Sequence, residues 1–226
     1  MKVNVLLPMK GHSERVKNKN MKQFDGFPLY HAVMKVLLES SYIDKIFINT
    51  DSNIIASDVD KNFNHGKVII IKRPTEIQGD FVSMNDIIAY DLTQCNGEYF
   101  LQTHSTNPLL KTSTIDLAIK MFFDNLELYD SLFSVTKVQA RFYDKNAKAI
   151  NHNPEELLRT QDLEPIYEEN SNFYIFSRNS FSLAGKKRIG LKPQIFSMNK
   201  LEAIDIDNPE DFTLAELLYK NKDIII

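Results

Sequence analysis

The chain has 226 residues, 43% of them apolar and 25% charged, which is enough to bury the core of one α/β domain. Its 27 basic and 30 acidic residues leave a formal net charge of −3, which gives no global reason to bind nucleic acid or an anionic membrane surface. A single cysteine, Cys95, excludes an internal disulfide. Because there is neither a signal-cleavage pattern nor an apolar run of about 20 residues, we expect a cytoplasmic protein.

Short β-branched runs alternate with longer amphipathic stretches through the first 136 residues. The runs predict strands at 2–7, 45–50, 67–72, 98–102 and 131–135. The stretches predict helices at 28–38, after a cap at 51–53, at 82–92 and at 113–123. Continuous apolar strands separated by helices are typical of a Rossmann-like, mostly parallel α/β sheet covered on both faces.

The pattern changes after residue 136. Helical periodicity stops until Asn208 and Pro209, which with the following acids predict the start of a last helix. Strand-like pieces occupy 172–176 and 194–197. We interpret 137–180 as a β-rich segment inserted into a single domain that spans 1–226, because nothing in it can fill a core of its own.

The connection after the first predicted strand is rich in cations. Residues 8–20 contain Lys10, Arg15, Lys17 and Lys19. Ligands of open parallel sheets bind beyond the carboxyl ends of the strands, and a turn with cations and backbone amides suits a polyphosphate. Its composition fits a solvated basic loop equally well, and its spacing matches neither a Walker A loop nor a GxGxxG fingerprint.

Two acids, Asp205 and Asp207, precede the last predicted helix. In an extended strand, residues two apart point to the same face, so the two carboxylates are expected to project together. Side-by-side carboxylates repel each other unless a cation lies beside them, and Mg²⁺ prefers such oxygen ligands. Alternatively, Asp207 only flanks the helix that starts at Pro209.

Six short blocks resemble, in the same order along the chain, the CMP-sugar synthetases, that is, the acylneuraminate and 3-deoxy-octulosonate cytidylyltransferases. The blocks are 8–20, 50–52, 73–76, 101–109, 170–175 and 204–211. The resemblance implies a nucleotide-diphospho-sugar transferase fold and a homodimer in which the inserted segment contacts the partner. It also implies a Mg²⁺-dependent reaction of CTP with an acidic 2-keto sugar, of the nonulosonic or sialic type, to give a CMP-sugar and pyrophosphate.

The resemblance also assigns roles to residues of this chain. The residues implied to be catalytic, at the triphosphate, are Lys10, Lys19 and Arg15. The residues implied to bind the nucleotide are Gly11, Ser13, Asn20, Asp51, Arg73, Val82 and Ser83. The residues implied to bind the sugar are Gln102, His104, Arg159, Gln161, Asn170 and Tyr174. The residues implied to bind Mg²⁺ are Asp205 and Asp207.

The chain departs from the family pattern at several positions. Lys10 stands where arginine is usual, Lys17 replaces a proline and Ser171 replaces a glycine. The stretch 103–109 is longer than its counterpart. These departures leave the identity of the sugar open. They also leave two alternatives: a cytidylyltransferase for another small phosphorylated or phosphonate acceptor, and a non-catalytic nucleotide sensor. His104 fits either a base for the sugar hydroxyl or a residue that only holds this longer loop in place.

Overall fold

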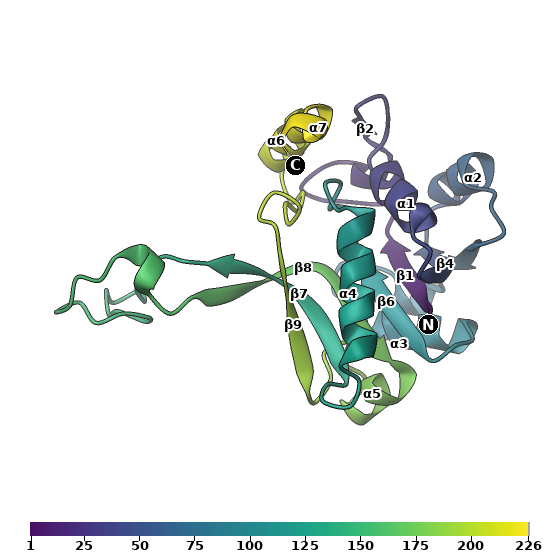
Figure 1. Ribbon diagram of the computed structural model, residues 1–226. Helices are drawn as coiled ribbons and strands as arrows, with labels where there is room; N and C mark the ends of the chain where they lie inside the picture. Colours follow the sequence, from purple (N-terminus) through teal and green to yellow (C-terminus); the bar gives the residue numbers. More distant parts are fainter. Residues whose placement is uncertain (226) are drawn as a thin grey trace.

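A seven-stranded sheet forms the centre of the molecule (Figure 1). The computed structural model describes the backbone of residues 1–225 and the side chains of 1–222 and 224. The strand order is β5-β4-β1-β6-β8-β7-β9. The strands are β1 (Val3–Met9), β4 (Ile43–Thr50), β5 (Val68–Lys72), β6 (Tyr99–Thr103), β7 (Ser131–Val138), β8 (Ile166–Ser177) and β9 (Pro193–Met198).

The pairing within this sheet confirms the predicted α/β class. β1 pairs in parallel with β4 and β6, β4 with β5, and β7 with β9. Only β8 runs antiparallel to its neighbours, β6 and β7. A separate two-stranded hairpin, β2 (Gln23–Phe24) and β3 (Phe27–Pro28), lies between the basic loop and the first helix.

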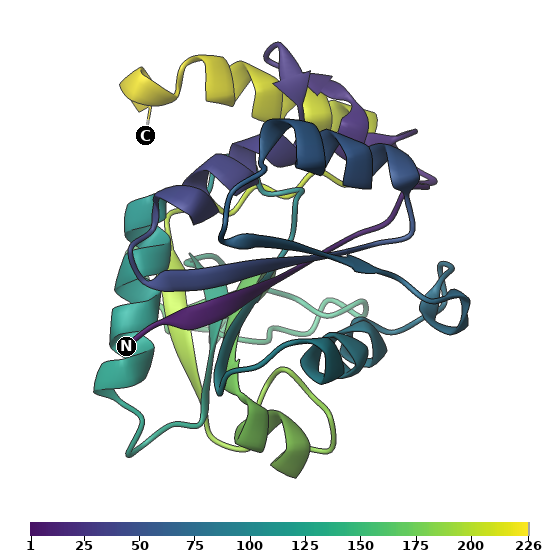
Figure 2. The same cartoon turned by 90° about the vertical axis from the view of Figure 1, so that its right-hand side faces the viewer.

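Helices cover both faces of the sheet, as Figure 2 shows with α1 and α2 above the strands and α3 and α5 below. The α-helices are α1 (Tyr30–Glu39), α2 (Asn53–Asn62), α3 (Met84–Gln94), α4 (Thr112–Asp124), α5 (Arg178–Leu183), α6 (Pro209–Lys220) and α7 (Lys222–Ile225). The 3₁₀ turns are η1 (Lys19–Met21), η2 (Thr75–Ile77) and η3 (Thr160–Asp162). None of the helices in the described part of the chain is both long and apolar enough to cross a bilayer.

Successive side chains of β1 point to opposite faces of the sheet, which explains why the core has two layers. Val5 and Leu7 join the core cluster formed with α1, α2 and α4, whereas Leu6 joins the cluster formed with α3 and α5. Every residue of β1 is buried, as expected for a central strand covered on both faces. Most of the predicted elements are confirmed to within a few residues at each end, but β8 starts six residues before its predicted start at 172. The sequence pattern does not predict α5, α7, the β2–β3 hairpin or the 3₁₀ turns.

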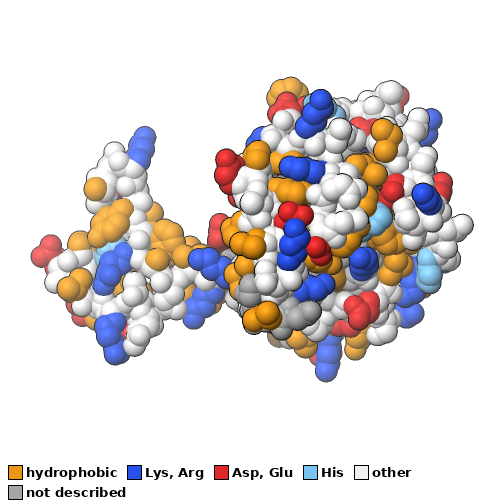
Figure 3. Space-filling view, turned by 90° about the horizontal axis from the view of Figure 1, so that it is seen from above, with side chains coloured by type: hydrophobic (Ala, Val, Ile, Leu, Met, Phe, Trp, Pro, Cys, Tyr) orange, Lys and Arg blue, Asp and Glu red, His pale blue; other side chains and the backbone are white. Residues whose placement is uncertain are grey.

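The segment between β7 and β8 projects from the body as a long arm (Figure 1). β8 pairs with β6 through residues 173–177, so the end of the predicted inserted segment 137–180 belongs to the central sheet. Residues 139–165 form the part that projects. Apolar side chains gather on it (Figure 3), and the large ones that are exposed within one chain are Tyr143, Ile150, Leu157 and Leu158.

A third core cluster joins the two ends of the chain. Val16 of the basic loop packs in one cluster with Phe24, Ile206 and Phe212. Phe24 and Phe212 meet edge to face, with ring centroids 5.5 Å apart. This apolar contact fixes the N-terminal loop against the segment that leads into α6.

Candidate active site

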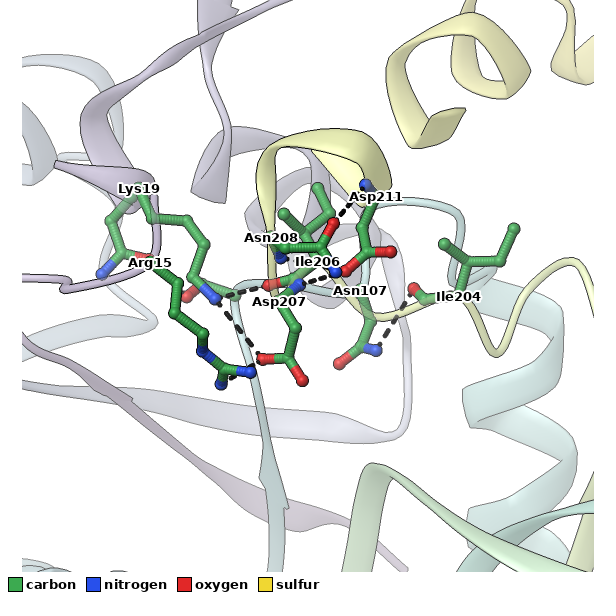
Figure 4. A network of polar contacts seen from close by, with 10 residues as sticks. Arg15, Lys19, Asn107, Ile204, Ile206, Asp207, Asn208 and Asp211 are labelled. Carbon is green, nitrogen blue, oxygen red and sulfur yellow. Dashed lines mark hydrogen bonds and ion pairs between the residues drawn. The ribbon is translucent and has the colours of Figure 1, made fainter. Parts of the chain in front are cut away.

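The basic loop after β1 and the acid pair before α6 lie side by side (Figure 4). The terminal nitrogen NH2 of Arg15 is 2.7 Å from Oδ1 of Asp207, and Nζ of Lys19 is 4.0 Å from the same oxygen. Nζ of Lys19 also donates a hydrogen bond to the carbonyl oxygen of Ile206. The predicted cationic turn and the predicted acidic pair therefore meet in space.

Burial of Ile206 orients the two acids. Residues 204–207 lie outside any strand, yet the expected alternation is present, because Ile206 is fully buried while Asp205 and Asp207 line pockets. The Ile206 backbone N–H donates to the carbonyl oxygen of Thr106 at 3.0 Å. Asp211, in the first turn of α6, accepts from the backbone N–H of Asp207 at 2.9 Å. These contacts hold the acid pair at the start of α6.

Two pockets meet at this acid pair. The first, here called the basic pocket, has a volume of about 240 Å³ and is lined by Pro8, Met9, Lys10, Ser13, Lys19, Asn20, Arg73, Met84, His104, Ser105, Thr106, Asp205 and Asp207. The second, here called the acidic pocket, has a volume of about 430 Å³ and is lined by Thr136, Glu168, Glu169, Asn170, Ser171, Lys200, Ala203, Ile204, Asp205 and Asp207. A larger cavity of about 640 Å³ between α1, α4 and the last helices contains none of the predicted site residues.

Hydrogen bonds shape the basic loop. The Asn20 side chain donates to the carbonyl oxygen of Lys10 at 2.9 Å and accepts from the hydroxyl of Ser105 at 2.6 Å. The backbone N–H of Gly11 donates to the Asp51 carboxylate at 2.6 Å. Asp51 and Asn20 thus hold the loop that presents Lys10 and Ser13 to the basic pocket.

The two predicted catalytic lysines differ in their surroundings. Lys10 forms an ion pair of 2.5 Å with Asp80, which lies between η2 and α3, and this contact lowers the pKa of Asp80. Lys19 is more enclosed. Burial lowers the pKa of Lys19, while the charges of Asp205 and Asp207 oppose that shift. Both lysines line the basic pocket.

Arg73 is positioned by a buried relay that the sequence reasoning missed. Its Nε donates to the Asn49 side chain at 2.6 Å, and the Asn49 side chain donates to Asp91 at 2.5 Å. Asn49 and Asp91 are fully buried. Burial raises the pKa of Asp91 to about 7. In the sequence, the signal for this relay is Asp91, an acid on the apolar face of the helix predicted at 82–92.

The turn at Val82 and Ser83 lies next to the basic pocket without lining it. The Ser83 hydroxyl caps α3, accepting from the backbone N–H of Asp86 at 3.1 Å. Met84, the next residue, does line the pocket. Direct contact of Val82 and Ser83 with a nucleotide therefore stays a prediction.

At the end of β6, three predicted sugar-binding residues surround an arginine that was not predicted. Gln102 is fully buried, and its Oε1 accepts from NH1 of Arg188 at 2.6 Å. The Arg188 guanidinium lies over the Tyr174 ring, 3.6 Å from its centroid. Gln102 also contacts Nε2 of His104 at 3.2 Å. The only sequence signal for Arg188 was its place in a short run of basic residues, 186–188.

His104 is a neutral imidazole in this environment. Burial lowers its pKa to about 3, and the charges of Arg188 and Lys19 act in the same direction. If the Gln102 amide donates to Nε2 of His104, that nitrogen is an acceptor and Nδ1 carries the proton. Such a group suits hydrogen bonding better than proton abstraction near neutral pH.

Asn170 lines the acidic pocket at an irregularity between β7 and β8. Phe133 lies opposite Tyr174 and Val135 opposite Glu169, so residues 170–173 bulge from the strand. The Asn170 side chain accepts from the Ser134 hydroxyl at 2.6 Å. The next residue, Ser171, has a φ of +56°, a left-handed conformation that favours glycine.

Arg159 and Gln161 lie on the arm, away from both pockets of the same chain. Arg159 makes a two-pronged ion pair with Asp162, at 2.6 and 3.1 Å. The backbone oxygen of Gln161 accepts from Gln139. A single chain therefore does not bring these two residues together with Gln102, because β7 carries the following segment beyond the body of the sheet (Figure 1).

The donor set at the acid pair fits Mg²⁺. One carboxylate oxygen of Asp205, Oδ1, is buried without a hydrogen-bond partner. Burial raises the pKa of Asp205, and the charge of Asp207 adds to the shift. Within the described residues, no group of three His, Cys, Asp or Glu side chains is placed to hold a metal. A pair of carboxylates suits Mg²⁺, which usually completes its shell with water and substrate phosphates.

Several known proteins are similar to this chain. "Pseudaminic acid cytidylyltransferase" of Campylobacter jejuni is 24% identical, over 97% of both chains. "Post-translational flagellin modification protein B" of Campylobacter coli is 25% identical, over 95% of this chain and 94% of that one. "N-acylneuraminate cytidylyltransferase" of Streptococcus agalactiae is 24% identical, over 94% of this chain and 52% of that protein.

Solved structures share the fold. A CMP:2-keto-3-deoxy-manno-octonic acid synthetase complexed with CTP superposes with a TM-score of 0.71 at 13% identity, covering 98% of this chain and 100% of that one. A 4-diphosphocytidyl-2C-methyl-D-erythritol synthase from Anaerococcus prevotii gives 0.69 at 12% identity, over 97% and 96%. The family model described as "Cytidylyltransferase" matches residues 4–226. With nearly its whole length matched, the chain belongs to the cytidylyltransferase family.

Proposed function

We propose that this cytidylyltransferase activates an acidic 2-keto sugar of the nonulosonic or sialic type. In the proposed reaction the anomeric hydroxyl oxygen of the sugar attacks the α-phosphorus of CTP. The bond from that phosphorus to the pyrophosphate oxygen breaks, the hydroxyl proton is released to solvent, and CMP-sugar and pyrophosphate are the products. The relatives from Campylobacter jejuni and Streptococcus agalactiae, which carry names of this kind, support the proposal.

The observation that carries the proposal is the place of the acid pair. Asp205 and Asp207 line both the basic pocket and the acidic pocket, which supports a role for them between two substrates, one in each pocket. The basic pocket offers Lys10, Lys19 and Arg73 to a polyanion. This arrangement suits transfer between a triphosphate and an acceptor, which depends on positioning and charge neutralisation more than on a covalent nucleophile.

The proposed roles follow from this placement. Lys10 and Lys19 neutralise the triphosphate and the leaving pyrophosphate, and Ser13 adds a hydrogen bond to a phosphate oxygen. Arg15, which pairs with Asp207, is close enough to do the same. Asp205 and Asp207 are the residues that would hold Mg²⁺. When bound, that ion neutralises phosphate charge and helps to orient the substrate oxygens.

A decisive experiment is to measure pyrophosphate release from CTP with a panel of 2-keto sugar acids, with and without Mg²⁺. We expect turnover with at least one acid and loss of turnover when Mg²⁺ is chelated. Turnover only with a phosphorylated or phosphonate acceptor would favour the alternative enzyme, a cytidylyltransferase for another small acceptor. Binding of CTP without turnover by any acceptor would favour a nucleotide sensor.

The proposal extends to assembly and location. We propose a homodimer, supported by the exposed apolar side chains of the projecting arm. In such a dimer the arm of one subunit would bring Arg159 and Gln161 to the other. A cytoplasmic location remains part of the proposal.

A further inference from the structure

We infer that Arg188 binds the carboxylate of the acidic acceptor and thereby selects for sugar acids. The inference rests on the proposed function and assigns a substrate contact to a residue outside the six blocks of the resemblance. It starts from the surroundings of the Arg188 side chain, which is half-buried in the segment between α5 and β9.

Three contacts hold Arg188 in place. NH1 donates to Oε1 of Gln102 at 2.6 Å, and the central guanidinium carbon lies over the Tyr174 ring, 3.6 Å from its centroid. The Arg188 backbone N–H donates to the Asn85 side chain in α3 at 3.3 Å. A planar guanidinium held in this way is ready to receive a carboxylate without much further ordering.

The charge of Arg188 has no carboxylate partner in the described part of the protein. None of the ion pairs found among the described side chains includes Arg188. Glu169 influences Arg188 from a distance, but the Tyr174 hydroxyl donates its hydrogen bond to Glu169. An arginine withdrawn from water without a paired anion is costly, so a function that supplies the anion is the simplest reason to keep it.

Arg188 lines neither pocket itself, but its contacts connect it to residues of both. Its partner Gln102 is close to His104, which lines the basic pocket, and Tyr174 is bonded to Glu169, which lines the acidic pocket. In the arrangement we infer, a sugar acid seated beside the acid pair and next to these residues directs its carboxylate to the Arg188 guanidinium.

The charges of the acidic pocket favour such a cation. Its lining includes Glu168, Glu169, Asp205 and Asp207, and Lys200 is its one basic residue. An anionic acceptor entering this field is repelled unless its carboxylate is directed to a fixed positive charge. Arg159, which the resemblance implies to bind the sugar, is engaged with Asp162 on the arm of the same chain.

The test compares four variants, R188M, R188K, K187M and K200M, with the unchanged chain in the pyrophosphate assay. The acceptor is the sugar acid that the unchanged chain turns over best, and its methyl ester serves as the uncharged analogue. For R188M we expect the KM for the acid to rise about 10- to 100-fold, the range of a charged hydrogen-bonded pair. The KM for CTP should stay within about twofold.

The other substrates and variants separate this role from a structural one. R188M should leave the KM for the methyl ester unchanged, and R188K, which keeps the charge but not the fork, should lie between R188M and the unchanged chain. K187M removes an exposed charge one residue away and should behave like the unchanged chain. An altered KM for CTP in R188M would indicate a misfolded site. In that case the R188K variant decides, because a raised KM for the acid with a normal KM for CTP in R188K still supports the inference.

Three outcomes would overturn the inference. One is an unchanged KM for the acid in both Arg188 variants, and another is an equal rise for acid and ester. The third is a rise with K200M as large as with R188M, which would assign the carboxylate to Lys200. Absence of turnover by the unchanged chain with every acid would instead refute the proposed function, and the inference would fall with it.

Discussion

Lys19 is the single residue that most directly links the two halves of the site. Its ammonium group contacts the Ile206 carbonyl oxygen and lies 4.0 Å from Asp207, with only 16% of its side chain exposed. Lys17, two residues earlier, is exposed to solvent. The two lysines thus offer a matched pair, one inside the basic pocket and one outside it.

We expect Lys19→Met to lower kcat/KM by about 100-fold or more, because the leaving pyrophosphate loses a desolvated cation. Lys17→Met, which removes the same charge from the same loop, should stay close to the unchanged chain. Pyrophosphate release measured at saturating Mg²⁺ checks both. Equal effects of the two variants would mean that only the summed charge of the loop matters.

Asp91 makes the stability of the fold depend on pH. Its pKa lies at about 7 in the folded chain against an ordinary value of 3.8, because burial disfavours the charged form. The contribution of the protonated carboxyl is therefore complete below the ordinary value and is lost as pH rises through about 7.

For Asp91→Asn we expect this pH dependence to disappear. The free energy of unfolding of the unchanged chain, measured against that of Asp91→Asn, should fall by about 2 kcal/mol from about pH 5 to about pH 8. Urea unfolding monitored by circular dichroism at several pH values measures the difference. Parallel curves for the two proteins would show that Asp91 does not ionise in this range.

The residues that could be predicted were those with a local sequence signal. Lys10, Lys19, Asp205 and Asp207 stand in short motifs, and the structure brings them together. Arg188 and the Asn49–Asp91 relay could not be predicted, because their partners lie on other strands and helices. Which buried polar groups meet depends on strand order, and a single sequence does not state that order.

At the scale of elements, the basic loop is fixed by its close approach to the start of α2. A Cβ atom on Gly11 would lie 2.8 Å from Cβ of Ser52, the residue that caps α2. Only glycine therefore allows the loop to sit where its N–H reaches Asp51. The position of Lys10 depends on this contact between two elements.

We expect Gly11→Ala to push the loop away from α2 and to raise the KM for CTP about 10-fold, since an overpacked contact is relieved by backbone movement. Gly66→Ala is the matched control, because a Cβ there meets no atom within 4 Å. Steady-state kinetics with varied CTP separates the two. Normal CTP affinity in Gly11→Ala would show that the loop tolerates the shift.

Strands and long helices were predictable because their periodicity is strong, and the exceptions have physical causes. α5 has six residues, and only Ser180 and Phe181 are buried, so it has too little amphipathic pattern to be recognised. β8 was predicted only at 172–176, although it spans Ile166–Ser177. Its first half contains Glu168, Glu169 and Asn170, and the bulge at Asn170 breaks the alternation.

For the whole molecule, the arm is the feature that most affects behaviour in solution. Leu157 is 89% exposed in a single chain, beside other apolar side chains of the arm. A surface of this kind is typical of an interface between proteins. The arm therefore gives the proposed homodimer a specific test.

We expect the unchanged chain to sediment as a dimer and Leu157→Glu to sediment as a monomer, because a charge would be buried in the proposed interface without a partner. Leu117→Glu, at a position 60% exposed on α4, should remain dimeric. Analytical ultracentrifugation distinguishes these outcomes, and unchanged circular dichroism spectra would show that both variants fold. A dimeric Leu157→Glu would place the interface elsewhere.

β8 is a single strand, bulged at Asn170, that has two surroundings. It starts at the base of the arm, passes Glu168, Glu169 and Asn170 on the wall of the acidic pocket, and ends beside β6 in the core. A change in the position of the arm is thus expected to move residues of the pocket wall, because both belong to the same strand. A partner that binds the outer end of the arm would therefore also affect the shape of the acidic pocket.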